Sequence, residues 1–281
     1  MMKIIVTGSS GFVGTNLVKN LRELKHEVTE LDITNGVDIT NWEQVKNISG
    51  FDIIIHLAAR IFVPDSYKFP REMYNLNIGG TLNALELCRM NNAKMIYASS
   101  YVYGVPQYLP IDEKHPTVAF NPYCRSKLIS EDLCRSYNKD FSVPIVVFRP
   151  FNIYGKGLNE NLLISLIRSQ IIKSGRISLK DPRPKRDFIH VNDAVAAYIK
   201  ALDYKSDNLE IFNLGFGVSY SVKEIAGMMA SNFSADIDIE FSNEVRKSEV
   251  LDTVADIALI KTKIGWEPLI SFEDGLKGLC G

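Results

Sequence analysis

Residues 3–14 read KIIVTGSSGFVG, and this stretch decides the fold. Its first five residues form an apolar run typical of a short buried strand, and apolar residues then recur at helical spacing at positions 17, 18, 21 and 24. Gly8, Gly11 and Gly14 stand between the strand and the helix. Glycines let the backbone approach a pyrophosphate, and a helix N-terminus adds free N–H groups and a positive dipole end. The order of strand, glycine turn and helix predicts a dinucleotide-binding loop, although the spacing is Gly-x-x-Gly-x-x-Gly rather than the commoner Gly-x-Gly-x-x-Gly.

A second strand is expected over residues 27–31, and it ends at Asp32, 18 residues after Gly14. A carboxylate at this place can accept both hydroxyls of an adenosine ribose and would repel a 2′-phosphate. Asp32 therefore favours NAD over NADP, although a nearby basic group could offset the repulsion. Aspartate is also common in turns such as the Thr34-Asn35-Gly36 that follows.

Size and composition limit the possible classes of protein. The 281 residues suffice for one large α/β domain or for a domain with an added lobe. A hydrophobic content of 46% indicates a globular core, and the net charge of −1 gives no general drive toward nucleic acid or an anionic membrane. The N-terminus has no signal pattern, and no apolar run reaches the length of a membrane helix.

The four cysteines show no metal-binding pattern, because none stands in Cys-x-x-Cys or beside histidines at ligand spacing. We expect no metal site, and free thiols in a reducing cytoplasm. The cysteines are Cys88, Cys124, Cys134 and Cys280.

Apolar strands and helical patterns alternate through the first half of the chain. Further strands are expected over 52–57, 94–98 and 144–148, and helices near 42–47, 75–90 and 122–138. Thr40 and Glu43 would form a capping box for the first of these helices. Continuous apolar strands suit a parallel sheet that is covered on both faces. The pattern predicts an α/β fold with a doubly wound parallel (Rossmann) sheet.

The pattern changes after Gly155. A helix is expected over 161–173, then a polar loop at 180–186, a strand at 210–214, and helices near 222–231 and 256–264. We interpret this part as a smaller, interleaved C-terminal lobe that binds the substrate. Residues 1–153 plus 187–213 would form the dinucleotide-binding domain, and residues 154–186 plus 214–281 the substrate lobe.

Tyr123-Cys124-Arg125-Ser126-Lys127 places a phenol and an ammonium one helical turn apart, so both point to one face. An unperturbed tyrosine has a pKa of about 10. A nearby cation lowers that pKa, and the phenol can then exchange a proton with a sugar or alcohol hydroxyl. Any helix can carry this spacing by chance, so its combination with the glycine loop is what predicts redox chemistry.

With further motifs, the chain resembles the extended short-chain dehydrogenase/reductases, the NAD-dependent epimerase/dehydratase group that modifies nucleotide sugars. The resemblance covers nearly the whole chain, in seven segments that stand in the family's order. They are TGSSGFVG at 7–14, HLAA at 56–59, Asn77 with Gly80-Thr81, YASSYVYG at 97–104, RPFNIYG at 149–155, RDFIHV at 186–191 and IGWEP at 264–268.

The resemblance implies a role for each matching residue. Tyr123 would be the acid/base, and Lys127 would hold the nicotinamide ribose and lower the pKa of Tyr123. Ser99, four residues before Tyr103, would share a hydrogen bond with the reacting sugar oxygen, and Ser100 is the fallback. The implied cofactor contacts, besides Tyr123 and Lys127, are Gly8, Ser10, Gly11, Phe12, Val13, Gly14, Asp32, Asp38, Ile39, Leu57, Ala58, Ala59, Asn77 and Phe151. The implied substrate contacts are Ser99, Asn152, Asn161, Arg186 and Arg246.

Arg186 and Arg246 match positions that grip the nucleotide diphosphate, for which the planar fork of arginine is suited. The alternative for Arg186 is a solvated basic loop. Arg246 is less typical, because Ser248-Glu249 stands where the family usually has Gly-Asp.

The chemistry implied by the resemblance is hydride transfer at a sugar carbon. The 4,6-dehydratases carry Asp-Glu straight after the catalytic Ser or Thr, and Ser100-Tyr101 stands there, which argues against a dehydratase. A nucleotide-sugar 4-epimerase, favoured by the NAD preference, and an NAD(P)H-dependent 4-ketoreductase of a 4-keto-6-deoxy nucleotide sugar, favoured by the short chain, both remain. We favour the epimerase. The base and the sugar cannot be read from the sequence.

Two further alternatives lie outside this chemistry. Small-molecule carbonyl reductases keep the Tyr-x-x-x-Lys pair but lack the Arg-Asp-Phe segment, and cofactor-sensing regulators commonly lose the tyrosine. By analogy with relatives, a homodimer through the helices at 75–90 and 122–138 is expected.

Overall fold

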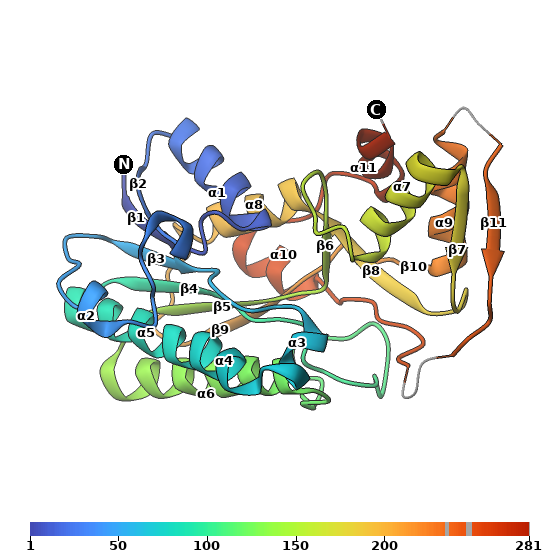
Figure 1. The fold of residues 1–281 in the computed structure, drawn as a ribbon. Coiled ribbons are helices and arrows are strands. Elements are labelled where there is room, and N and C mark those ends of the chain that lie inside the picture. The colour runs from blue at the N-terminus through green and yellow to red at the C-terminus, as the bar shows by residue number, and fades with distance from the viewer. Residues whose placement is uncertain (234–235, 246–248, 281) are drawn as a thin grey trace.

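The computed structural model describes residues 1–233, 236–245 and 249–280, and it contains a large parallel sheet with a smaller group of elements beside it (Figure 1). The sheet has six parallel strands in the order β2-β1-β3-β4-β5-β9. They are β1 (Lys3–Thr7), β2 (Glu27–Leu31), β3 (Ile53–His56), β4 (Lys94–Ala98), β5 (Ile145–Pro150) and β9 (Glu210–Leu214). The strand order reverses between β1 and β3, and ligands of such sheets bind outside the carboxyl ends at this switch point.

Helices cover both faces of the sheet (Figure 1). One face carries α1 (Phe12–Glu23), α8 (Val191–Lys200) and α10 (Ala258–Ile264), and the other carries α2 (Trp42–Val45), α5 (Gly80–Asn91) and α6 (Pro122–Phe141). Side chains alternate across a strand, so Ile4 and Val6 of β1 belong to the first apolar cluster and Ile5 to the second. The expected fold class, a doubly wound α/β sheet, is confirmed.

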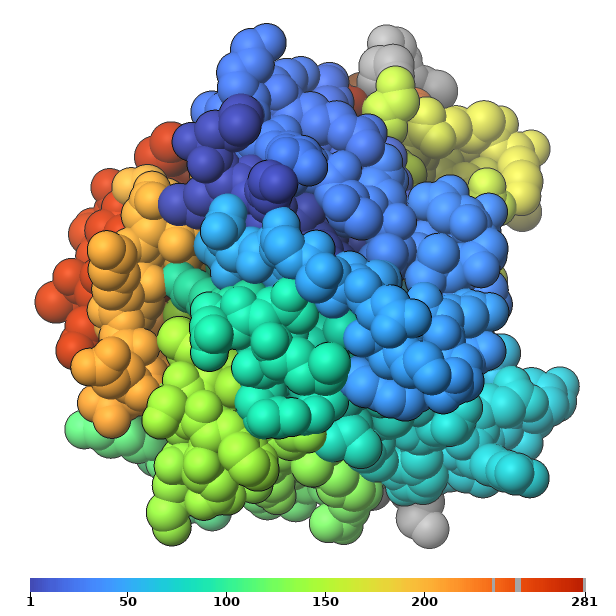
Figure 2. Space-filling view, turned by 90° about the vertical axis from the view of Figure 1, so that its left-hand side faces the viewer, coloured from blue at the N-terminus to red at the C-terminus, as the bar shows by residue number. Residues whose placement is uncertain are grey.

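The smaller group holds two short sheets and three helices around its own apolar cluster, which includes Ile167, Ile225 and Phe272. Its strands are β6 (Asn152–Tyr154), β7 (Arg176–Leu179), β8 (Lys185–His190), β10 (Ser219–Ser221) and β11 (Asp238–Phe241), and its helices are α7 (Leu163–Ser174), α9 (Val222–Ser231) and α11 (Phe272–Cys280). Viewed from the end opposite this group, the surface comes mainly from the first half of the chain, coloured blue to green (Figure 2).

Several local expectations differ from the structure. The helix expected over 75–90 is continuous with α4 (Pro70–Tyr74) through a π-helical turn, Asn75–Gly79, and α3 (Val63–Lys68) precedes it. The proposed capping box at residue 40 is wrong, because Thr40 donates to Asp38 and α2 begins after Asn41. The five short strands of the smaller group, α8 and α11 were not predicted. The strands have only three to six residues each, too few to establish a period, whereas α8 does carry apolar residues at helical spacing, as at Val191, Ala194 and Val195.

Among the residues that the structure describes, no helix combines the length and the apolar character needed to cross a bilayer. Cys88, Cys124 and Cys134 are buried free thiols.

A buried carboxylate ties β8 to the segments that follow β9. Asp187 Oδ1 accepts a hydrogen bond from Phe216 N at 2.7 Å, and Oδ2 accepts from Gly217 N at 2.9 Å and Ala255 N at 3.0 Å. The backbone packs closely here, since a Cβ on Gly215 would lie 2.8 Å from the same Oδ2. Asp187 thus fixes the place of the strand on which Arg186 and Phe188 stand.

Burial raises the pKa of Asp187 to about 6, against the effect of its three N–H donors. The ordinary aspartate pKa is about 4. The native state therefore holds this proton more tightly than the unfolded state does. The contribution of Asp187 to stability is largest below pH 4 and is lost as the pH rises to about 6.

We expect Asp187→Asn to lower the free energy of unfolding at pH 7 by about 1–3 kcal/mol, because an amide cannot accept all three N–H groups. Lowering the pH from 7 to 5 should stabilise the natural protein relative to the variant by about 1 kcal/mol. Urea unfolding at both pH values measures this. Glu240→Gln, on the exposed side of β11, is the control and should behave like the natural protein. Equal stability of Asp187→Asn and the natural protein at both pH values would contradict the assignment.

Candidate functional site

A cavity of about 770 Å³ lies where the carboxyl ends of the sheet strands meet the smaller group of elements. Its wall runs from the glycine loop past the ends of β3 and β4 and the start of α6 to β6, β8 and α7. The predicted site residues that it brings together are Gly8, Gly11, Phe12, Val13, Gly14, Leu57, Ala59, Ser99, Ser100, Tyr123, Lys127, Phe151, Asn152, Asn161 and Arg186.

Other predicted cofactor residues lie behind or beside this wall. Ile39 is buried in the core, and Asp38 binds the backbone and hydroxyl of Thr40. The buried amide of Asn77 bonds to both backbone groups of Arg60 and to the Ser126 hydroxyl. The Ala58 N–H donates to Thr7 Oγ1 at 3.2 Å. Cofactor contact stays a prediction for these residues. Arg246 lies outside the described residues.

The glycine loop forms a tight backbone cradle. A Cβ on Gly14 would lie 2.2 Å from the Gly8 carbonyl oxygen, and a Cβ on Gly8, which has φ +67°, would lie 2.7 Å from Ala58 N. Larger residues would therefore push α1 off the end of β1. Gly11 precedes α1, and no side chain of the described residues caps that end. The N–H groups of the first turn and the positive helix dipole thus favour an anion there, which fits a dinucleotide pyrophosphate.

Asp32 is held at the side of this loop by three hydrogen bonds. Its Oδ1 accepts from Thr34 N at 3.0 Å and from Thr34 Oγ1 at 2.8 Å, and its Oδ2 accepts from Ser10 N at 3.1 Å. The hydroxyls of Ser10 and Thr34 are 2.6 Å apart. Partial burial raises the pKa of Asp32, but the bonds from Thr34 and Ser10 outweigh it and hold the pKa below its ordinary value. The carboxylate is thus charged and fixed in place.

The start of α6 sets the direction of the tyrosine and the lysine. Asn121 caps the helix by accepting a hydrogen bond from Cys124 N at 2.8 Å, and Pro122 opens the first turn. Tyr123 and Lys127 then line the cavity one turn apart. Lys127 is 3% exposed, and its Nζ donates to the Ala98 carbonyl oxygen at 2.8 Å.

Lys127 was expected to lower the pKa of Tyr123, but in the protein alone the pKa of Tyr123 lies above its ordinary value. Burial raises the pKa of Tyr123 to about 12, although a hydrogen bond with Ser100 lowers it in part. Burial also lowers the pKa of Lys127 to about 7. Desolvation acts on both groups in favour of their neutral forms, because a charge is less stable away from water. In the protein alone, burial outweighs any lowering of the Tyr123 pKa by Lys127.

The two neighbouring serines serve different partners. The buried Ser99 hydroxyl donates to Glu131 Oε1 at 2.6 Å, whereas Ser100 hydrogen-bonds to Tyr123. Counting four residues back from Tyr103 therefore selects the serine that is turned away from Tyr123. The structure favours Ser100 as the hydroxyl beside the reacting group. Tyr101-Val102 follow it, so no carboxylate stands after this serine either.

The predicted substrate residues on the far wall of the cavity already have partners within the protein. Arg186 lies there as predicted, but its guanidinium forms an ion pair with Glu249 and donates to the Val250 carbonyl oxygen at 2.7 Å. Asn152 Nδ2 donates to the Asp187 carbonyl oxygen at 2.9 Å. Phe151 packs edge-on against Tyr101, with ring centroids 5.3 Å apart. Glu249 thus balances part of the charge of Arg186.

Sequence reasoning missed much of the apolar wall. These residues come from the loop after β3, the segment before α7, α7 itself and β7, and they carry no motif. They are Ile61, Leu158, Leu162, Leu163, Leu166 and Leu179. Glu249 was quoted as a departure from the family pattern, but its pairing with Arg186 was not foreseen. No group of three or more potential metal ligands occurs in the described part of the chain.

Comparisons with known proteins find a matching family model, similar sequences and a similar solved structure. The sequence matches the NAD dependent epimerase/dehydratase family over residues 4–215. It is 32% identical to a putative UDP-glucose 4-epimerase of Methanocaldococcus jannaschii, over 98% of this chain and 96% of that protein. It is 27% identical to the GDP-6-deoxy-D-mannose reductase of Pseudomonas aeruginosa, over 99% of this chain and 95% of that protein. The solved structure of RMD from Pseudomonas aeruginosa complexed with NADPH has a TM-score of 0.91 and 26% identity, covering 100% of this chain and 98% of that one.

We expect Ser100→Ala to lower kcat by roughly 100-fold, because it removes a hydrogen bond to Tyr123, the predicted acid/base. Ser99→Ala removes the same hydroxyl one residue earlier, so it is the matched control. It should mainly lower stability, by about 1 kcal/mol, because Glu131 loses a donor. Steady-state kinetics and urea unfolding of both variants measure this. The larger loss of kcat in Ser99→Ala would show the assignment to be reversed.

Proposed function

The chain belongs to the NAD dependent epimerase/dehydratase family, as its motifs predicted, and from this we propose that it catalyses hydride transfer at C4 of a nucleotide-diphosphate sugar. We propose further that it is an NAD-dependent 4-epimerase. The observation that carries the proposal is one cavity in which the glycine loop, Tyr123, Lys127 and Ser100 meet.

In this proposal Tyr123 exchanges the proton of the sugar 4-hydroxyl. Ser100 holds the same oxygen and hydrogen-bonds to the phenol. The Lys127 ammonium stabilises the phenolate from one turn away on α6. A nicotinamide dinucleotide held by its pyrophosphate at the glycine loop would supply the hydride acceptor or donor. The apolar wall keeps water from the reacting carbon and the phenol.

The preference for NAD is supported by Asp32, whose fixed, charged carboxylate suits two ribose hydroxyls and not a 2′-phosphate. NADPH in the related Pseudomonas structure keeps NADP as an alternative for this chain.

The choice of reaction is supported by the absence of acidic side chains in the segment 99–104, where a dehydratase would need them for the elimination of water. The similarity to a putative UDP-glucose 4-epimerase supports the epimerase. The similarity to a GDP-6-deoxy-D-mannose reductase supports a 4-ketoreductase as the second candidate. A small-molecule carbonyl reductase and a cofactor-sensing regulator have less support, because the chain keeps both the Arg-Asp-Phe segment and Tyr123.

The assembly and the division of the chain are also proposals. Leu82 of α5 is 40% exposed and Ile129 of α6 is 36% exposed, and a homodimer through these helices would cover both. We assign residues 1–153 plus 187–213 to cofactor binding and the remainder to the substrate, except that α10 of the remainder packs on the large sheet. The reduced thiols of Cys88, Cys124 and Cys134 favour a cytoplasmic location.

The assay that separates the two reactions uses UDP-galactose without added cofactor, and a 4-keto-6-deoxy GDP sugar with NADPH. An epimerase forms UDP-glucose in the first mixture. Stoichiometric loss of NADPH absorbance in the second mixture would establish the reductase instead.

Tyr123→Phe should lower kcat in the productive assay by 10²-fold or more, roughly the range of general acid–base catalysis, while the affinity for NAD⁺ stays nearly unchanged. Tyr137→Phe, on the same helix but away from the cavity, is the control and should keep full activity. Full activity in Tyr123→Phe would exclude Tyr123 as the acid/base.

Asp32→Ala should weaken NAD⁺ binding by on the order of tenfold, because two charge-assisted hydrogen bonds are lost, and should remove the discrimination against NADP⁺. Glu30→Gln removes one charge from the same strand, where Glu30 pairs with Arg22, and should change neither affinity. Isothermal titration calorimetry with both nucleotides measures this. Tighter binding of NADP⁺ than of NAD⁺ by the natural protein would overturn the cofactor preference.

A further inference from the structure

A buried ion pair lies directly behind the candidate site. Tyr123, Lys127 and Glu131 stand at successive turns of α6, so their side chains form one row on the face that looks toward the sheet. The first two residues of this row line the cavity, and the third is buried beneath it. Glu131 therefore continues the row of reactive side chains into the protein interior.

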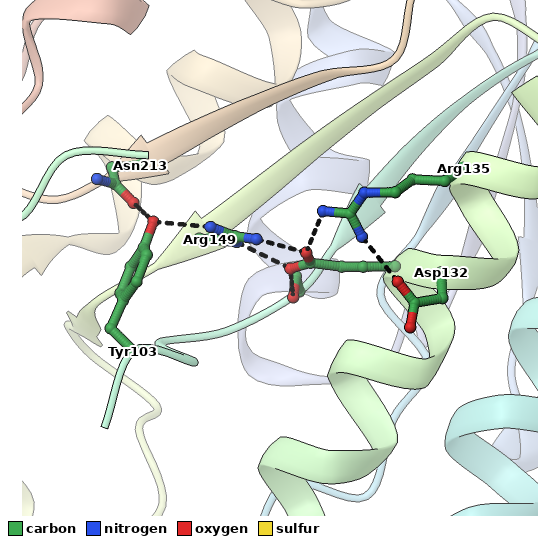
Figure 3. A network of polar contacts seen from close by, with 7 residues as sticks. Tyr103, Asp132, Arg135, Arg149 and Asn213 are labelled. Carbon is green, nitrogen blue, oxygen red and sulfur yellow. Dashed lines mark hydrogen bonds and ion pairs between the residues drawn. The ribbon is translucent and has the colours of Figure 1, made fainter. Parts of the chain in front are cut away.

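Both oxygens of Glu131 accept hydrogen bonds, and two of the donors, Arg149 and Arg135, are labelled in Figure 3. Arg149 Nε donates to Oε1 at 2.9 Å, and Arg149 Nη2 donates to Oε2 at 2.6 Å, so the two side chains meet fork to fork. Ser99 also donates to Oε1, which makes the third hydrogen bond to this carboxylate. Arg135 lies on the solvent side, with its Nη2 at 3.5 Å from Oε2. The carboxylate has one fixed position.

Arg149 is itself fixed from the far side (Figure 3). Its Nη1 donates to Tyr103 Oη at 3.1 Å, and that hydroxyl donates to Asn213 Oδ1 on β9. The network thus joins α6, β5, β9 and the loop after β4 across the end of the sheet. A buried ion pair is poor evidence for stability, because well-packed apolar residues of equal volume often do as well. Another role therefore has to be considered.

Lys127 is buried, so its charged form is stable only with a negative charge nearby. Its Nζ has the Ala98 carbonyl oxygen as a partner and lies 5.0 Å from the centre of the Tyr97 ring. Burial lowers the pKa of Lys127 to about 7, so its charge at neutral pH is easily lost. The phenolate of Tyr123 can be stabilised only by the charged form.

The other titratable groups that face Lys127 are neutral at pH 7. Burial and the lysine itself lower the pKa of His56 on β3 to about 3, and burial raises the pKa of Tyr97 on β4 far above its ordinary value. Burial likewise raises the pKa of the Cys134 thiol on α6, and that of Tyr123 to about 12. Among the described residues acting on Lys127, Glu131 is the carboxylate, and it is held in an ion pair with Arg149.

We propose that Glu131 is a positioning residue for the reaction: locked by Arg149, its carboxylate keeps the ammonium of Lys127 charged and in place behind Tyr123. The inference rests on the proposed function, because the charge of Lys127 matters only if Tyr123 exchanges a proton. A positioning role predicts that loss of Glu131 shifts the titration of Lys127, whereas a purely structural role predicts no such shift.

The test is NMR titration of the protein labelled with ¹³Cε-lysine, with the Lys127 signal assigned by its loss in Lys127→Met. In Glu131→Gln the titration midpoint of Lys127 should fall by on the order of one pH unit, because Arg149 is left without its counter-charge. Glu131→Gln with Arg149→Met removes both charges and keeps the volume. It should also lower the midpoint, and it carries the test if the single variant does not fold.

Tyr103→Phe is the matched control, because it breaks the same network beyond Arg149 and leaves the charge of Glu131 intact. It should leave the midpoint unchanged while lowering the melting temperature. In the productive assay, the alkaline limb of kcat/KM should move to lower pH in the two Glu131 variants and not in Tyr103→Phe. Lower melting temperatures with unmoved midpoints in the folded Glu131 variants would overturn the proposal. That result would leave the proposed function standing, which Tyr123→Phe tests separately.

Discussion

The contact of Gly14 with the carbonyl oxygen of Gly8 is the constraint on which the site depends. No side chain fits between them, since a Cβ would come within 2.2 Å of that oxygen, so α1 sits directly on the end of β1. This approach aims the uncapped N–H groups of α1 at the switch point of the sheet. The ends of β3, β4 and β5 then bring their loops to the same place, and α6 adds its first two turns. The cavity follows from this backbone geometry.

Burial decides the chemistry of the groups that line the cavity. It moves the pKa of Tyr123 upward and that of Lys127 downward, each at a cost of several kcal/mol to the charged form. Catalysis by a phenolate and an ammonium therefore needs compensating groups on the protein. Ser100 supplies a hydrogen bond to the phenol, and Glu131, fixed by Arg149, supplies a negative charge behind the ammonium.

The opposite wall is organised by carboxylates in two different ways. Asp187 is buried and gathers three backbone N–H groups, so it fixes β8 as a rigid edge of the cavity. Glu249 is partly exposed and pairs with Arg186 on that same strand. A diphosphate that approaches Arg186 meets a cation whose charge is already partly balanced. If Arg186 binds the diphosphate of the substrate, as its place in the family motif predicts, the phosphate oxygens share this cation with Glu249.

The sequence by itself determined which segments form the strands of the large sheet, the glycine loop, and the common face of Tyr123 and Lys127. These features follow from local rules: apolar periodicity, the space that a glycine leaves, and the pitch of a helix. Only the tertiary structure decided that Ser100 and not Ser99 meets Tyr123, that Arg186 pairs with Glu249, and that Glu131 pairs with Arg149. The directions of the pKa shifts of Tyr123 and Lys127 also belong to it. Each of these depends on which way a side chain turns and on how much water the surrounding chain removes, and residue spacing along the sequence records neither.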